Sequence, residues 1–294
     1  MGTSLPGAGL LGEDRMLRTP DGRLLRAMVR GHGDGLVVLE SGLGMSGLYW
    51  GLVQPGIAEH ARVVAYERAG LGGSDPDPRP RGLERLADDL DVVIEAFPHR
   101  RLTLVGHSWG GPIVRTAAAR RLVAGRPLDG IVLVDQTDEH ADLYFSFLAR
   151  ALFAVQAATT VPFARMGVLS ALSKGMVHGL PEPLDRAVLE ASCSLTAAKE
   201  TRAELSRLIP ELRRLRDHPL SLGDVPVRVI SGHASPSGRR ASDQRIRAAL
   251  TAAHAATALR HPNAQLVPAD RSEHLIPATE PELIVAQVRA LLDG

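Results

Sequence analysis

The serine in the pentapeptide Gly106-His107-Ser108-Trp109-Gly110 is the residue of this chain best suited to nucleophilic chemistry. An apolar run, 102–105, precedes the pentapeptide, and a helical run of small residues follows it. A serine at a sharp strand-to-helix turn has a strained backbone, and its flanking glycines leave room for the crowded chain. The pattern therefore predicts that the Ser108 hydroxyl stands exposed at the carboxyl end of a strand, where it can attack a carbonyl carbon.

Such a serine needs a general base, because a hydroxyl is a poor nucleophile at neutral pH. The chain has 11 histidines. His274 is the predicted base, since it lies between the last predicted strand and the last predicted helix, at the same edge of the sheet as Ser108. His107 belongs to the turn itself and cannot fold back onto the hydroxyl. His254 and His261 lie in or beside a predicted helix and are weaker candidates.

The base in turn needs an acid that orients it. Asp135 is the predicted acid, because it directly follows a buried strand whose end lies at the same edge. Asp138 and Asp243 are the alternatives, and Asp135 could also simply cap a turn. Glu40 and Glu67 end two other strands near the predicted site. We expect them to order loops, although either could reach a histidine.

Acyl transfer also requires N–H donors for the oxyanion that forms on the carbonyl. The backbone N–H of Trp109, at the start of the helix after Ser108, is one predicted donor. The N–H of Leu43 is the other, because the segment Ser41-Gly42-Leu43-Gly44 follows a predicted strand and its glycines allow a close approach. A plain turn at this segment is the alternative.

The elements that must position these residues alternate between strand and helix. A hairpin is predicted over 14–30, with its turn at 20–22. Further strands are predicted at 36–40, 62–66, 102–105, 130–134, 227–231 and 265–268, and helices at 48–59, 83–97, 113–119, 242–257 and 282–292. This order predicts an α/β protein with a mostly parallel twisted sheet and helices on both faces. In such sheets functional residues lie at the carboxyl ends of the strands.

The alternation stops in the middle of the chain, where only helices are predicted. They fall at 149–158, 168–176, 184–196 and 203–216, separated by prolines. We expect a helical lid over 139–224, inserted into a core formed by 15–138 and 225–294, after a flexible N-terminus at 1–14. Apolar lid residues favour an apolar acyl or alcohol group in the substrate, with ordinary packing as the alternative: Phe145, Phe147, Phe153, Phe163 and Met166.

The composition narrows the class of protein. The 294 residues are 45% hydrophobic, with a formal net charge of +1, which gives no reason to expect nucleic acid or an anionic membrane as a partner. The single cysteine, Cys193, cannot form a disulfide within the chain or a thiolate metal cluster. No membrane span is expected, and we expect a soluble, cytoplasmic protein. The residues imply no metal and no organic cofactor, and favour no particular oligomeric state.

Three segments together resemble the α/β-hydrolase family. They are the turn at Ser108 with its double glycine Gly110-Gly111, the loop 67–74, and Ser272-Glu273-His274 before the last helix. The likeness runs over about residues 15–292, apart from the lid. Segments 39–50 and 132–140 resemble actinobacterial members in particular. The resemblance implies the fold and serine hydrolase chemistry, with no particular substrate.

The chain departs from the family pattern in two places. Members often carry His-Gly in the oxyanion loop, where this chain has Ser41-Gly42. Members usually place the acid a few residues after the strand that follows the lid, but 232–238 contains no carboxylate here. Some members place the acid where Asp135 stands, which keeps Asp135 as the expected acid.

The expected reaction is hydrolysis of a carboxylic ester of a small or medium apolar substrate, with an acyl group carried on Ser108. The same residues could instead cleave a thioester, an amide or a carbon–carbon bond. A non-catalytic receptor that keeps the fold and its pocket is the alternative from outside the enzymes.

Overall fold

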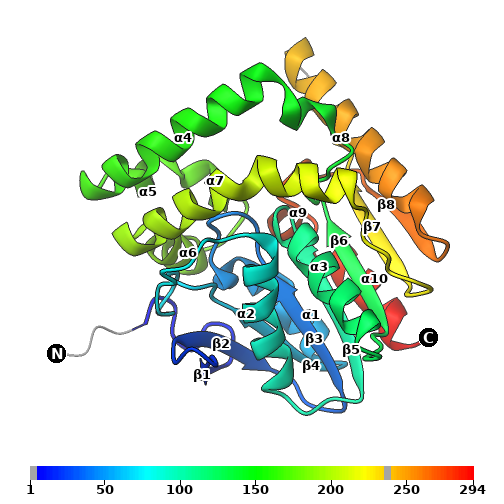
Figure 1. The fold of residues 1–294 in the computed structure, drawn as a ribbon. Helices are drawn as coiled ribbons and strands as arrows, with labels where there is room; N and C mark the ends of the chain where they lie inside the picture. The colour runs from blue at the N-terminus through cyan, green and yellow to red at the C-terminus, as the bar shows by residue number, and fades with distance from the viewer. Residues whose placement is uncertain (1–4, 235–239) are drawn as a thin grey trace.

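The computed structural model describes residues 5–234 and 240–294. An eight-stranded sheet runs through its centre in the order β1-β2-β4-β3-β5-β6-β7-β8 (Figure 1). The strands are β1 (Glu13–Arg18), β2 (Leu24–Arg30), β3 (Gly35–Glu40), β4 (Arg62–Tyr66), β5 (Arg101–His107), β6 (Gly130–Val134), β7 (Val227–Gly232) and β8 (Ala264–Ala269). β1 and β2 form the predicted antiparallel hairpin, and β2 pairs antiparallel with β4. Every other pairing is parallel, so β3 to β8 end at one edge.

Helices cover both faces of this sheet, which confirms the predicted fold class. They are η1 (Gly47–Leu52), α1 (Gln54–Ala58), α2 (Leu83–Glu95), α3 (Gly110–Val123), α8 (Ala241–Arg260), α9 (Ile276–Thr279) and α10 (Pro281–Leu292). Alternate residues of β3 point to opposite faces. Leu36 and Val38 join a core with α2 and α3, whereas Val37 and Leu39 join a second core with η1, α1 and α10. Burial on both faces explains why these strands are continuous apolar runs.

Between β6 and β7 the described chain forms only helices and loops. The helices are η2 (Asp142–Phe145), α4 (Phe147–Arg165), α5 (Leu169–Leu172), η3 (Lys174–Val177), α6 (Leu184–Cys193) and α7 (Leu195–Asp217). We call residues 139–224 the helical insertion. Several of its boundaries differ from the predicted ranges. α4 extends through Pro162 to Arg165, beyond the predicted end at 158. α7 begins at Leu195 instead of at 203, because the Ser194 hydroxyl accepts a hydrogen bond from the Ala197 N–H.

The helical insertion is attached to the core by apolar packing and by buried charge. Leucines of α7, including Leu208 and Leu212, belong to the core around α2 and α3. Leucine and valine side chains of α6 belong to the core around η1. Glu204 of α7 is fully buried and pairs with Arg68 at 3.1 Å and with Arg81 at 3.0 Å.

The beginning of the described chain packs more closely than a flexible N-terminus would. Leu11 is only 2% exposed and lies in the core with η1. The guanidinium of Arg26 donates to the Pro6 carbonyl at 2.7 Å, and β1 begins at Glu13. Residues 6–14 thus have defined packing and hydrogen-bond contacts, while flexibility of the segment 1–14 stays a prediction. One helix among the described residues, α4, is long and apolar enough to cross a membrane by length and composition alone.

Candidate active site

Ser108 lies on the tight turn between β5 and α3. Its φ angle is +53°, an unusual value for a residue other than glycine. A Cβ on Gly106 would lie 2.5 Å from the Gly110 carbonyl oxygen, and a Cβ on Gly110 would lie 2.4 Å from the Glu40 carbonyl oxygen. Neither distance is possible for a real side chain. Both glycines are thus required for the turn, as the sequence pattern predicted.

His274 and Asp135 meet at the same edge of the sheet. His274 lies in the loop between β8 and α9, and its Nδ1 is 2.7 Å from Asp135 Oδ2. Asp135 directly follows β6, is 2% exposed, and has a φ of +39°. Nδ1–H donates to the carboxylate, so the second ring nitrogen, Nε2, carries the lone pair. The imidazole is therefore oriented as a base whose acceptor nitrogen points away from Asp135.

His107 connects the Ser108 turn to the loop that carries His274. Its Nε2 lies 2.9 Å from the His274 carbonyl oxygen, and the two imidazole rings are 4.8 Å apart. Since His107 immediately precedes Ser108, this contact holds the His274 loop beside the serine. Burial, with a further contribution from neighbouring His274, lowers the pKa of His107 to about 3. His107 is thus neutral near pH 7 and donates Nε2–H to the carbonyl.

The protonation of His107 makes fold stability dependent on pH. An unfolded chain keeps the ordinary histidine pKa of 6.5, so below that pH the unfolded state binds more protons than the folded state. The stability that neutral His107 contributes is fully present above pH 6.5 and is lost as the pH falls toward 3. We expect acidification from about pH 7.5 to about pH 5 to lower the free energy of unfolding by about 2 kcal/mol through this residue.

Denaturant unfolding of a His107→Gln variant at the two pH values tests this expectation. Glutamine keeps an N–H donor but does not titrate, so the variant should lose less stability on acidification than the wild type. His32→Gln, which removes an exposed imidazole, is the control and should behave like the wild type. An equal loss in His107→Gln and the wild type would contradict the assignment.

Asp135 has a second charged partner that the sequence pattern did not indicate. Arg247 of α8 donates two hydrogen bonds to the Asp135 carboxylate, at 2.8 and 2.9 Å. The Gly232 N–H donates to Oδ1 at 3.0 Å, and His254 Nδ1 lies 3.8 Å from the same oxygen. Burial alone would raise the pKa of Asp135, but the hydrogen bond from His274, with His254 and Arg247, holds this pKa well below its ordinary value. The carboxylate is therefore ionised and fixed in place.

The alternative acids lie in other hydrogen-bond networks. Asp138 accepts from Thr257 Oγ1 at 2.6 Å and from Gln136 Nε2 at 2.7 Å, and it contacts His140 Nδ1 at 2.8 Å. Asp243 lies in the first turn of α8. Among the described residues, Asp135 is the carboxylate recorded in contact with His274.

The weaker base candidates also have structural roles. His254 Nδ1 lies 2.8 Å from Ser231 Oγ, and its Nε2 lies 2.8 Å from the Gln136 carbonyl oxygen. His261 follows the C-terminus of α8 and lines a separate cavity. Burial and nearby Arg115 lower the pKa of His261.

The predicted oxyanion segment lies directly against Ser108. A Cβ on Gly42 would be 3.2 Å from Ser108 Cβ and 3.6 Å from Ser108 Oγ. Within the described part of the chain, the N–H groups of Leu43 and Trp109 donate to no recorded acceptor. Leu43 and Trp109 therefore remain the predicted donors to a substrate oxygen.

Arg68 holds the segment 41–44 in place through its backbone carbonyls. Its guanidinium donates to the Ser41 carbonyl at 2.7 Å and to the Gly42 carbonyl at 2.5 Å. It also pairs with the Glu40 carboxylate at 2.6 Å. Glu40 thus orders the segment 41–44 through Arg68, the role expected of a carboxylate at this strand end.

Glu67 orders the next loop in the same way. Its carboxylate accepts from Ser46 Oγ at 2.5 Å and from the Gly47 N–H at 3.1 Å. Neither Glu40 nor Glu67 has a recorded contact with His274 in the described structure. Both residues therefore support the loops that surround the serine.

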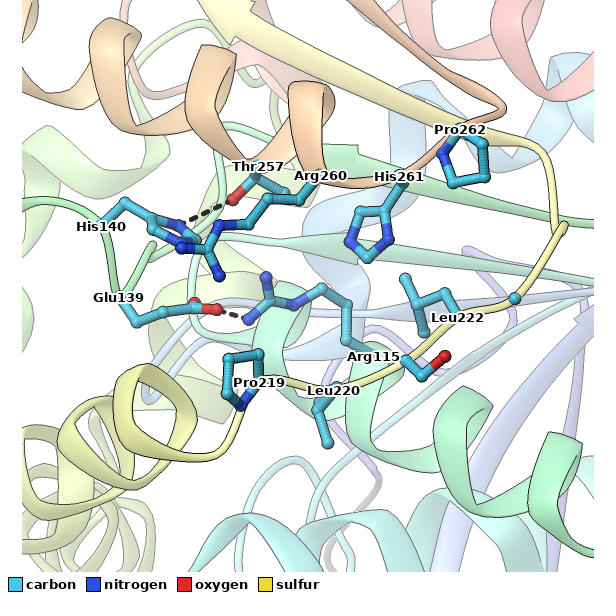
Figure 2. Close-up of a pocket in the computed structure, with 12 residues that line it drawn as sticks. Arg115, Glu139, His140, Pro219, Leu220, Leu222, Thr257, Arg260, His261 and Pro262 are labelled. Carbon is cyan, nitrogen blue, oxygen red and sulfur yellow. Dashed lines mark hydrogen bonds and ion pairs between the residues drawn. The ribbon is translucent and has the colours of Figure 1, made fainter.

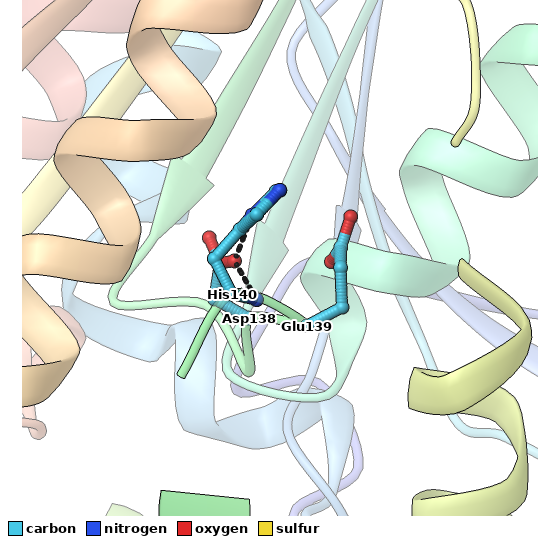
Figure 3. Close-up of side chains that lie close together, drawn as sticks. All are labelled: Asp138, Glu139 and His140. Carbon is cyan, nitrogen blue, oxygen red and sulfur yellow. Dashed lines mark hydrogen bonds and ion pairs between the residues drawn. The ribbon is translucent and has the colours of Figure 1, made fainter. Parts of the chain in front are cut away.

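Asp138, Glu139 and His140 form a cluster of possible metal ligands next to the site (Figure 3). Their atoms are already engaged, because Glu139 pairs with Arg115 at 2.6 Å and Asp138 holds His140. Beside them lies a cavity of about 320 Å³ (Figure 2). Its titratable lining residues are Arg115, Glu139, His140, Arg260 and His261. Ser108 is not among the residues that line it.

Comparison with known proteins supports the fold. Residues 35–160 match the sequence model of the alpha/beta hydrolase fold, and this segment contains Ser108 and Asp135. This chain is an α/β-hydrolase-fold protein. Solved structures with this fold superpose over nearly all of it. An esterase from Exiguobacterium antarcticum has a TM-score of 0.72 at 16% identity, covering 95% of this chain and 99% of that one.

Other relatives carry different names. The epoxide hydrolase CorEH has a TM-score of 0.72 at 16% identity, covering 95% of this hydrolase-fold chain and 98% of that one. RutD of Agrobacterium fabrum, named as a carbamate hydrolase, is 30% identical over 113 residues, which are 37% of this chain and 42% of RutD. The chain thus aligns with less than half the length of this curated relative. The likenesses establish the α/β-hydrolase fold.

Proposed function

We propose that this α/β-hydrolase-fold protein is a serine hydrolase that cleaves a carboxylic ester through an acyl-enzyme. One observation carries the proposal: the 2.7 Å pair of His274 with ionised Asp135 is held beside the strained Ser108 turn by His107. A base, an acid that orients it and a hydroxyl are the three groups that serine acyl transfer requires.

The proposed cycle has two halves. Ser108 Oγ attacks the ester carbonyl while His274 Nε2 takes its proton, and Asp135 stabilises the charged imidazole. The N–H groups of Leu43 and Trp109 donate to the oxyanion. His274 then gives the proton to the departing alcohol, and an acyl group stays on Ser108. A water molecule deprotonated by His274 attacks this acyl group, which releases the acid and restores the serine.

The nucleophile itself argues for an acyl substrate over an epoxide. A serine that opened an epoxide would be left with an ether, which water does not readily cleave. A carboxylate nucleophile would instead form an ester that water can hydrolyse. Because residue 108 is serine, acyl transfer is the chemistry that lets the enzyme turn over.

A carbamate is a second candidate substrate, favoured by the similarity to RutD. Attack by Ser108 on a carbamate carbonyl would pass through the same oxyanion and leave a carbamoyl group on the serine.

The apolar character expected of the substrate rests on the helical insertion. Two of its phenylalanines, Phe145 and Phe153, pack on the core with α2 and α3, whereas Phe147 is 80% exposed.

A fluorophosphonate probe tests the proposal. Attack by an activated serine displaces fluoride and leaves a stable phosphonyl group on the oxygen. We expect one label per chain, on the peptide that contains Ser108, and loss of p-nitrophenyl ester hydrolysis in proportion to labelling.

Denatured protein is the control and should not label. Absence of label on native protein that still binds small apolar ligands would favour a receptor. A panel of p-nitrophenyl esters, thioesters and aryl carbamates of graded length then separates the substrate classes.

A further inference from the structure

The outer face of α4 is apolar although it faces solvent. Phe147 is 80% exposed, Leu148 68%, Leu152 60% and Val155 60%. Beyond the helix, Met166 is 62% exposed, and Val168 and Leu172 are exposed as well. We call these seven residues the α4 surface. Soluble proteins rarely leave so many large apolar side chains together in water, and such a patch usually marks a site of interaction.

The opposite side of α4 is already occupied. Phe153 and Ala157 pack on the core with α2 and α3, Thr160 and Val161 are buried, and α4 lies along α7 (Figure 1). The helix is therefore apolar on both sides. A helix of this kind is covered all round, by protein or by lipid. Because its inner side is held by the core, α4 can meet a partner only with its outer side, while lying flat along it.

The charges around the α4 surface select an anionic partner. No aspartate or glutamate occurs from residue 143 to residue 181, whereas Arg150, Arg165 and Lys174 are all exposed. Asp142, just before this stretch, pairs with Arg216 at 2.9 Å. The near-zero net charge of the whole chain conceals this local excess of positive charge.

The neighbouring helix α7 has the same bias. Its glutamates Glu200, Glu204 and Glu211 are buried, whereas Lys199 and Arg202 are exposed. A second copy of this chain seated on the α4 surface would bring like charges together, with no carboxylate from 143–181 to pair them. An anionic lipid surface supplies both an apolar interior and negative headgroups.

We propose that the α4 surface docks this protein on anionic membranes, with α4 lying in the plane of the headgroups. At 19 residues the helix is about 28 Å long. Apolar side chains of such a helix enter the boundary between headgroups and acyl chains, and the basic residues contact the headgroups. This inference does not depend on the proposed hydrolysis, because docking is measured without any substrate.

Vesicle flotation with the full chain tests the docking. Wild-type protein should float with vesicles of phosphatidylcholine and phosphatidylglycerol, and should bind vesicles of phosphatidylcholine alone about tenfold or more weakly. The variant Phe147→Ser/Leu148→Ser/Leu152→Ser should lose about tenfold or more of the binding to the anionic vesicles. Val123→Ser/Leu259→Ser is the matched control, since these side chains are 92% and 88% exposed and lie elsewhere. It should bind like the wild type.

Thermal unfolding verifies that each variant is folded. Should the triple variant fail to fold, Arg150→Gln/Arg165→Gln leaves the apolar residues in place and should weaken binding to anionic vesicles. Raised salt should act in the same direction. The proposal is wrong if wild-type protein does not float with anionic vesicles, or if the folded triple variant floats equally well. A dimer in sedimentation velocity that the triple variant dissociates would instead assign the α4 surface to a second copy.

Discussion

Replacing Ser108 with alanine is expected to lower kcat for the best ester substrate by about ten-thousandfold or more. The oxygen that attacks the carbonyl is removed, and the remaining groups can only polarise the substrate. Folding should be unaffected, because alanine and serine meet the same strain at a φ of +53°. The measurement is steady-state ester hydrolysis, and fluorophosphonate titration gives the concentration of active sites in the wild type.

Ser206→Ala is the matched control for this variant. Ser206 is exposed on α7 and donates only to the Ala203 carbonyl, at 2.7 Å, so its loss should leave the rate unchanged. Retention of more than about a tenth of the wild-type rate by Ser108→Ala would remove the serine from the mechanism. A water molecule activated directly by His274 would then be the better account.

The strands of the core could be predicted because their apolar runs report burial directly. The predicted ranges for β4 and β6, 62–66 and 130–134, agree with the structure. The turn at Ser108 could be predicted equally well, because a Cβ at Gly106 or Gly110 would clash with the neighbouring backbone. Local chemistry of this kind needs no knowledge of distant residues.

Contacts between side chains that are far apart in the sequence could not be predicted. Arg247 reaches Asp135 only because α8 packs on β7, and no spacing in the sequence indicates that contact. Pro162 was read as the end of a helix, yet α4 continues through it to Arg165. Phe147 was expected to favour an apolar substrate group or to pack within the lid, whereas the structure leaves it 80% exposed. Periodicity identifies a helix but does not say what covers its faces.

Asp135→Asn is expected to lower kcat/KM by about a hundredfold or more. The asparagine has one acceptor oxygen where the carboxylate has two, and it no longer stabilises the charged form of His274. The change also leaves Arg247 without its buried carboxylate, which should cost about 3 kcal/mol of the free energy of unfolding. A combined Asp135→Asn/Arg247→Met variant should recover part of this stability and none of the rate, because methionine removes the unpaired charge without restoring the acid.

Asp138→Asn is the matched control, because it makes the same change at a buried carboxylate in the neighbouring network. It should retain more than about a tenth of the wild-type kcat/KM. Denaturant unfolding of all the variants separates the effect on stability from the effect on rate. If Asp135→Asn kept the wild-type rate while Asp138→Asn lost it, the acid would be Asp138, and His274 would have to move away from its 2.7 Å contact during the reaction. The bidentate Arg247 pair makes that exchange unfavourable, since it holds the Asp135 carboxylate ionised and turned toward the imidazole.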